Sequence, residues 1–179
     1  MNQFVDTVEQ QLASINGLTH VVIAYSGGVD SHVLLLACSI LKPILPNIAF
    51  CAMYIDHGLH ADSAKWRDHC DSVCVDLRVD FISQKVNAAD LNGDGPEQAA
   101  RYARYDALKS VVTAHTVLLT AQHQDDQAET LMLQLLRGAG VNGLASMPAC
   151  NNFGLGFIAR PFLSLSKADI KHYAVDEGL

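Results

Sequence analysis

The first lysine or arginine of this 179-residue sequence is Lys42. A Walker A phosphate-binding loop needs a lysine, followed by serine or threonine, directly after its second glycine. The glycine pair Gly27-Gly28 is followed by valine and aspartate instead. Kinase-like and GTPase-like nucleotide binding is therefore excluded at this pair, and its spacing also fails the Gly-x-Gly-x-x-Gly fingerprint of dinucleotide-binding proteins.

Long apolar segments are absent from the sequence as well. No run approaches the roughly 20 residues that an apolar helix needs to cross a bilayer, and the N-terminus carries no positively charged region of the secretory type. We therefore expect no membrane partner and a cytoplasmic location.

Basic residues are scarce along the whole chain, with 12 lysines and arginines against 19 aspartates and glutamates and a net charge of −7. This balance gives no indication of nucleic-acid binding, so handling RNA would require a local basic face or a further segment. The hydrophobic fraction of 50% and the charged fraction of 17% indicate one folded domain with a full core rather than a disordered chain.

The five cysteines include no Cys-x-x-Cys pair. Their number is odd, and several lie in apolar segments, where a thiol packs as a small hydrophobic side chain. Cys70 and Cys74 are four residues apart on a predicted helix, but no second pair accompanies them as a zinc site would need. We predict reduced, mostly buried thiols.

The most informative stretch joins a five-residue apolar run, Val21 to Tyr25, to the turn Ser26-Gly27-Gly28 and then to a periodic apolar segment. This order predicts a buried strand, a tight turn and a helix. Glycines let the backbone approach a ligand closely, so that main-chain N–H groups can converge on an anion at the helix N-terminus. Asp30 and Ser31 add a carboxylate for a metal ion and a hydroxyl for a phosphate oxygen.

Strand and helix patterns alternate along the chain. Strands are predicted over 20–26, 47–55, 80–86, 116–122 and 157–162, and helices over 3–16, 30–42, 63–78, 97–114, from the 123–130 block to Arg137, and over 166–178. In the third helix, the predicted inward stripe is Trp66, Cys70, Val73, Cys74 and Leu77, and glycine-rich residues 138–156 are predicted to form a loop. The alternation predicts a doubly wound, Rossmann-like parallel α/β sheet of about five strands, and the common strand order is 3-2-1-4-5.

Polar residues follow three of these strands where ligands of such sheets bind, outside the carboxyl ends. They are Ser26 to Ser31, Asp56 with His57, and His123 to Asp126. Carboxylates at a strand-to-helix junction suit Mg²⁺ that bridges phosphates. One of Asp125 and Asp126 is expected to cap the helix and the other to take part in chemistry.

Basic residues near these junctions have both a functional and a plain structural interpretation. Arg101 and Arg104 share one helix face and could grip phosphates, or they could form an ordinary solvated face. Arg137 either complements a helix dipole or takes part in binding beside the glycine-rich loop. His57 either belongs to the site or ends a strand in a simple turn.

Five motifs, in this order, resemble the N-terminal catalytic domain of the tRNA(Ile)-lysidine synthetase family, whose phosphate loop is of the PP-loop ATP-pyrophosphatase type with an adenine nucleotide alpha hydrolase-like fold. The resemblance covers residues 20–165, and the motifs are Ser26 to Ser31, Tyr54 to Leu59, Pro96 to Tyr105, His123 to Thr130 and Leu135 to Gly140. Two features depart from that family. It usually has histidine where Gln122 stands, and its members continue beyond the last predicted helix into domains that help to bind tRNA, which this chain is expected to lack.

The resemblance implies a ligase that uses ATP, Mg²⁺, free L-lysine and an isoleucine tRNA with a CAU anticodon. ATP would adenylate the C2 oxygen of the wobble cytidine, and lysine would then displace AMP to give lysidine. The resemblance assigns ATP binding to Ser26, Gly27, Gly28, Val29, Asp30, Ser31, Met53, Arg101, Arg104 and Arg137. It assigns Mg²⁺ to Asp30 and Asp126, and catalysis to these two residues with His123 and His57, either histidine being a candidate base.

Three other functions remain open at this point. A PP-loop tRNA thiolase would share the loop but commonly carries Cys-x-x-Cys pairs, and other adenylating synthetases would need a glutaminase-like segment that is not visible. A non-catalytic nucleotide-binding module would not need the His-x-Asp-Asp cluster. The residues that bind lysine, those that read the anticodon, and the oligomeric state, with a homodimer as one alternative, stay open.

Overall fold

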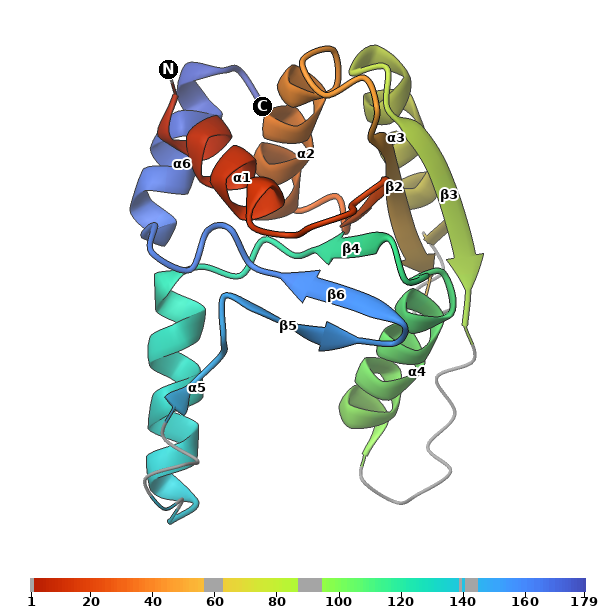
Figure 1. Ribbon diagram of the computed structural model, residues 1–179. Helices are drawn as coiled ribbons and strands as arrows, with labels where there is room; N and C mark the ends of the chain where they lie inside the picture. Colours follow the sequence, from red (N-terminus) through yellow and green to blue (C-terminus); the bar gives the residue numbers. More distant parts are fainter. Residues whose placement is uncertain (1, 57–62, 87–94, 139, 141–144) are drawn as a thin grey trace.

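The computed structural model describes residues 2–56, 63–86, 95–138, 140 and 145–179. Its centre is a six-stranded sheet in the order β3-β2-β1-β4-β6-β5 (Figure 1). The strands are β1 (His20–Ala24), β2 (Ala49–Asp56), β3 (Asp80–Lys85), β4 (Thr116–Leu119), β5 (Cys150–Phe153) and β6 (Gly156–Ala159). The helices are α1 (Gln3–Ala13), α2 (Val29–Leu41), α3 (Ser63–Asp76), α4 (Pro96–Ser110), α5 (Gln124–Leu136) and α6 (Lys167–Asp176).

The predicted parallel α/β sheet and its strand order are confirmed, with β6 as the predicted fifth strand. The prediction of a continuous loop over 138–156 is wrong at its end, because residues 150–153 form β5, which pairs antiparallel with β6. The predicted strand over 157–162 is also too long. Pro161 follows directly after Arg160 and has no N–H to donate to a neighbouring strand.

The alternation of side chains along the strands builds a core on each face of the sheet. Val21 and Ile23 of β1 face a large cluster that also contains residues of α1, α2, α3 and α6. Val22, between them, faces a smaller cluster formed with Met53 and with Leu108 of α4. One face is therefore covered by several helices, while α4 is the helix that supplies buried residues to the other.

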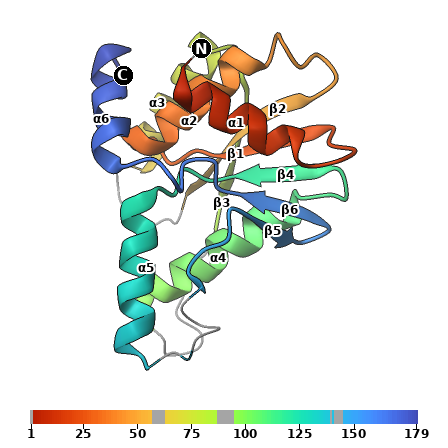
Figure 2. The same cartoon turned by 60° about the vertical axis from the view of Figure 1, so that its left-hand side comes forward.

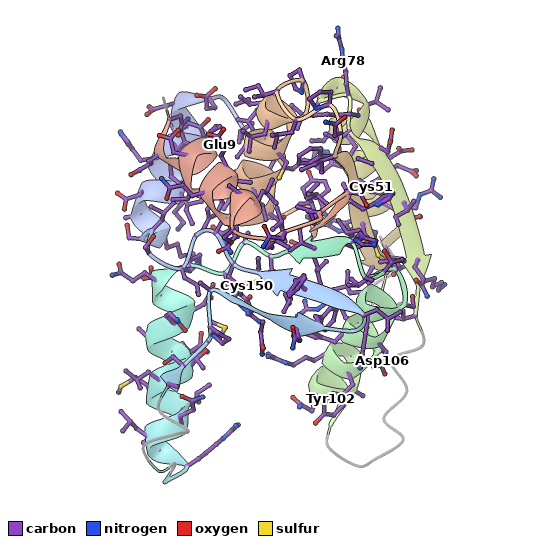
Figure 3. All side chains as sticks on the ribbon, in the orientation of Figure 1. Glu9, Cys51, Arg78, Tyr102, Asp106 and Cys150 are labelled. Atoms are coloured by element: carbon purple, nitrogen blue, oxygen red, sulfur yellow. The ribbon has the colours of Figure 1, made fainter. Side chains whose placement is uncertain are left out.

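The orientation of α4 leaves its outer side in solvent. Tyr102 and Asp106 project away from the sheet (Figure 3), and Tyr102 is 49% exposed. Ala107 and Leu108, on the inner side, are buried. The helix is thus anchored near its C-terminal end and leaves residues 101–105 beside the carboxyl ends of the strands.

α5 packs less closely than the other helices and has no buried residue. It extends beyond the edge of the sheet in both views (Figures 1 and 2). Its apolar side chains Met132, Leu133, Leu135 and Leu136 are between 44% and 81% exposed. In the described ranges, no helix combines the length and the apolar character that crossing a membrane requires.

The third helix corrects one prediction and confirms another. Cys70 and Cys74 are fully buried against the sheet, but Trp66 is 54% exposed and does not belong to the inward stripe. Trp66 lies in the first turn of α3, one turn before the buried Cys70. All five cysteines are free thiols, and three of them are buried.

Candidate active site

A pocket of about 350 Å³ lies at the carboxyl ends of β1, β2 and β4. β1 and β4 are adjacent and parallel, with Ile23 opposite Leu119, so the segments that follow them start side by side. Seven residues that the sequence singled out line this pocket, namely Ser26, Gly28, Asp30, Ser31, Met53, Arg104 and Asp126. The predicted meeting of the glycine turn with the acidic junction is therefore present in the structure.

The Ser26 to Ser31 loop is held closed by its own hydrogen bonds. The Ser31 hydroxyl donates to Gly28 O at 2.8 Å and accepts from Ser26 N at 3.2 Å. Gly27 has a φ of +78°, and a Cβ built there would lie 3.0 Å from the Sγ of buried Cys70. Only glycine fits both the backbone conformation and the space, so the loop is preorganised without a ligand.

The N-terminus of α2 opens at this loop without a side-chain cap. His32 N is bonded to Gly28 O. The amides of Val29, Asp30 and Ser31 precede this first helical bond and therefore have no intrahelical acceptor. Free amides and the positive end of the helix dipole, next to a pocket, make a suitable place for a phosphate group.

The His123 side chain lies between the carboxylates of the two junctions and is only 3% exposed. Its Nε2 is 3.8 Å from Asp30 Oδ2, and its Nδ1 is 3.5 Å from Asp126 Oδ2. Asp126 Oδ2 also accepts a hydrogen bond from His123 N at 2.9 Å, as an N3 side chain reaching back to the residue before the helix does. The imidazole therefore lies between the two carboxylates, beyond hydrogen-bond distance of either.

The two neighbouring aspartates have different surroundings. Asp125 is exposed and its Oδ2 accepts a 2.9 Å hydrogen bond from Lys167 N, the first amide of α6. This bond is the main cause that lowers the pKa of Asp125, with a smaller contribution from His123. Asp125 thus caps the last helix rather than its own, while Asp126 lines the pocket.

Replacing Asp125 by alanine should lower the free energy of unfolding at pH 7, because the α6 amide loses its acceptor. A carboxyl with a lowered pKa in the folded state stabilises the protein above its unfolded-state pKa of about 3.9, and this contribution disappears as the pH falls through the folded-state pKa. The difference between wild type and Asp125→Ala should therefore shrink between pH 5 and pH 3 in urea titrations. A difference that stays constant over this range would contradict the assigned bond.

Two arginines of α4 pack over one aromatic ring beside the pocket. The guanidinium carbons of Arg101 and Arg104 each lie 5.5 Å from the centre of the Tyr105 ring. Tyr105 and Arg104 line the pocket, whereas Arg101 is exposed and lies outside it. Cation–π contacts of this kind hold a guanidinium in place without neutralising it.

The structure does not bring every predicted site residue to the pocket. Arg137 is exposed at the far end of α5, about 20 Å along the helix from His123. Gly27 and Val29 belong to the Ser26 to Ser31 loop, but neither of them lines the pocket. His57 lies outside the described residues.

Sequence reasoning missed most of the wall of the pocket. The missed residues are Ala24, Tyr25, Tyr54, Ile55, Tyr105, Leu108, Thr120, Ala121 and Gln122. Most of them are apolar or aromatic and sit at strand ends, so their patterns resemble those of ordinary core residues. An available signal was position, because the last residues of adjacent parallel strands face the ligand crevice.

Comparisons with known proteins identify the family of the chain. The whole chain, residues 1–179, matches the PP-loop domain family. Among curated proteins, the tRNA(Ile)-lysidine synthase of Proteus mirabilis is 43% identical over 98% of this chain, and that of Pseudomonas fluorescens is 45% identical over 91% of it. The chain spans only 39% and 36% of the length of these two relatives.

Solved structures with lower sequence identity share the fold. A U34-tRNA thiolase from Methanococcus maripaludis superposes with a TM-score of 0.79 at 17% identity, over 98% of this chain and 63% of that one. An NAD+ synthetase from Burkholderia pseudomallei gives a TM-score of 0.59 at 17% identity, over 100% of this chain and 69% of that one. The phosphate loop and the uncapped N-terminus of α2 agree with the family match. Because this match extends over residues 1–179, the chain belongs to the PP-loop domain family.

Proposed function

We propose that residues 1–179 form the ATP-binding and adenylating part of an enzyme that ligates free L-lysine to the wobble cytidine of an isoleucine tRNA with a CAU anticodon. The observation that carries the proposal is the convergence of Asp30 and Asp126 on one pocket beside an uncapped helix N-terminus. His123 does not line this pocket and lies buried between the two carboxylates. The relatives at 43% to 45% identity are named tRNA(Ile)-lysidine synthase, and this name indicates the reaction that we propose.

The carboxylates at the pocket suit Mg²⁺. Asp30 Oδ1 is buried and has no hydrogen-bond partner among the described residues, and Asp126 lines the pocket from the opposite junction. In the described part of the chain, no group of three or more histidine, cysteine, aspartate or glutamate side chains is placed to hold a metal ion. Mg²⁺ is commonly bound by one or two carboxylates together with phosphate oxygens of the substrate, and Asp30 and Asp126 could supply these carboxylates. When bound here, Mg²⁺ would neutralise phosphate charge.

In the first step, the C2 oxygen of cytidine would attack the α-phosphorus of ATP, and the bond to the β-phosphate would break. The amides of Val29, Asp30 and Ser31 would bind the departing pyrophosphate at the start of α2. Arg104, held by Tyr105, would add positive charge on the opposite side of the pocket. Stabilisation of developing phosphate charge by fixed groups is the main effect asked of these residues.

In the second step, the amine of lysine would attack C2, the C2–O bond would break, and AMP would leave. The attacking amine loses a proton to a base. Of the two candidate histidines, His123 is 3% exposed and contacts both carboxylates, which suits a positioning role better than contact with an amine. His57 remains the candidate base, and Arg101 remains a candidate contact to phosphate.

The thiolase alternative has less support. The likeness to the Methanococcus maripaludis thiolase is a likeness of fold at 17% identity. The relatives at far higher identity carry the lysidine synthase name.

The target cytidine must be unstacked to be modified, and an anticodon loop presents its bases in this way.

The test is a product assay with the full-length gene product, ATP labelled in the α- and γ-phosphates, and tRNA(Ile) with a CAU anticodon. We expect AMP and pyrophosphate in a tRNA-dependent reaction, and lysine in the wobble nucleoside after digestion of the tRNA. A tRNA with a different anticodon is the control. Formation of ADP would contradict adenylation, sulfur in the nucleoside would indicate a thiolase, and nucleotide binding without turnover would indicate a non-catalytic module.

A further inference from the structure

The Gln122 side chain, directly after β4, is oriented by two donors. Its Oε1 accepts a hydrogen bond from the Thr120 hydroxyl at 2.7 Å and another from Arg160 Nε at 2.7 Å. Arginine Nε can only donate, so the oxygen of the amide must face it, and these two bonds use both lone pairs of that oxygen. The orientation of the amide is therefore determined by chemistry.

The amide nitrogen of Gln122, Nε2, is a hydrogen-bond donor available to a ligand in the pocket. Gln122 lines the pocket, and in the described residues Nε2 donates to no protein acceptor. Nε2 is also not one of the buried polar atoms without a partner. Because Gln122 is half-buried and lines the pocket, we assign its unpaired Nε2 to a ligand in that pocket.

Arg160 gives this amide a fixed positive charge on its far side. Its Nη1 donates to Pro148 O at 2.9 Å, so the guanidinium is held from two directions. Arg160 is half-buried, and burial lowers its pKa. Within the described ranges it forms no ion pair with a carboxylate. A cation bonded to the amide oxygen polarises the amide and makes its N–H groups stronger donors.

We propose that Gln122 is a substrate-binding residue that donates from Nε2 to a phosphate oxygen of ATP, and that Arg160 is the residue that positions and polarises it. This inference rests on the proposed function, because it deepens the ATP site. An anionic oxygen fits best, since the donor is backed by a charge that no described carboxylate balances. An amide cannot exchange a proton at neutral pH, so residue 122 binds in this protein and takes no part in acid–base catalysis.

The decisive variant is Gln122→Glu. The carboxylate keeps an oxygen for Thr120 and Arg160, so the local structure should survive with an unchanged or higher melting temperature. The donor toward the pocket becomes a negatively charged acceptor. Binding of a non-hydrolysable ATP analogue with Mg²⁺, measured by calorimetry, should weaken about 10- to 100-fold, as expected for the loss of a charge-assisted hydrogen bond. Binding of adenosine, which has no phosphate, should not change.

The matched control is Gln124→Glu, which adds the same charge two residues further on, at an exposed position outside the pocket. It should leave nucleotide affinity within about twofold. Arg160→Met should weaken binding of the ATP analogue, and Arg160→Lys should restore part of it. Circular dichroism of each variant checks that it is folded.

The outcomes separate the two proposals. If the wild-type chain binds no ATP analogue, the proposed function fails and this inference fails with it. If the wild type binds and Gln122→Glu binds equally well, the inference alone is overturned, and the bonds of Gln122 are only structural. Equal weakening by Gln124→Glu would also overturn it, because the effect would then come from long-range charge.

Discussion

Replacing either Asp30 or Asp126 by asparagine should reduce the rate of adenylate formation by about 10²- to 10³-fold in the full-length protein. Each substitution keeps the size of the side chain and removes one of the two negative charges that we propose to hold Mg²⁺ beside the phosphates. Fixed charges in such a site act where charge develops in the transition state, and losing one typically costs 10² to 10³ in rate. Release of pyrophosphate with tRNA present is the measurement.

The control for this pair is Asp125→Asn. The asparagine oxygen can still accept the hydrogen bond from Lys167 N, and Asp125 does not line the pocket. Its rate should stay within a few-fold of wild type. Near-normal rates for both Asp30→Asn and Asp126→Asn, with a normal rate for Asp125→Asn, would remove the two carboxylates from the mechanism.

Replacing Gly156 by alanine should destabilise the fold by about 3 kcal/mol or more, the upper end of what overpacking costs. A Cβ at this position would lie 2.3 Å from Thr116 O and 2.4 Å from Thr113 O, far inside van der Waals contact. Thr116 O belongs to the first residue of β4 and Thr113 O to the segment just before it, so both are backbone atoms that cannot rotate away as a side chain can. Urea unfolding followed by circular dichroism measures the loss.

Gly140→Ala is the matched control, because no atom of the residues that the structure describes lies within 4 Å of a Cβ built there. It should change the free energy of unfolding by less than about 0.5 kcal/mol, as surface substitutions usually do. If Gly156→Ala proved equally harmless, the close approach of the hairpin to Thr113 and Thr116 would be wrong.

The sheet could be predicted from the sequence because its inner strands are nearly continuous apolar runs. Such runs, as at Val21 and Phe50, are typical of strands covered on both faces. β5 was missed because it contains Asn151 and Asn152, and asparagine is rare in strands. A two-residue turn, Gly154-Leu155, joins it to β6, and the glycine of this short turn is a hairpin signal that the sequence offered.

The site was predictable where polar residues follow strands and obscure where it depends on packing. The place of Asp30 after β1 indicated a carboxylate for a metal ion, whereas the place after β4 left Asp125 and Asp126 open and only the family resemblance selected Asp126. The structure puts Asp30 and Asp126 at one pocket. The cap that Asp126 gives to α5 spans only three residues. The bond from Lys167 to Asp125 joins residues 42 positions apart, so no local pattern could show that Asp125 caps α6. The same holds for the bond between Arg160 and Gln122, which are 38 positions apart.

The two faces of the sheet are covered by different numbers of buried residues, and this difference affects how the protein can evolve. The large cluster beneath α1, α2 and α6 carries most of the buried apolar residues, whereas the wall formed by α4 adds only a few. Substitutions along α4 can therefore alter which molecule the crevice accepts while leaving most of the folding free energy in place. Such an arrangement lets new substrate preferences arise on an old scaffold without first weakening it.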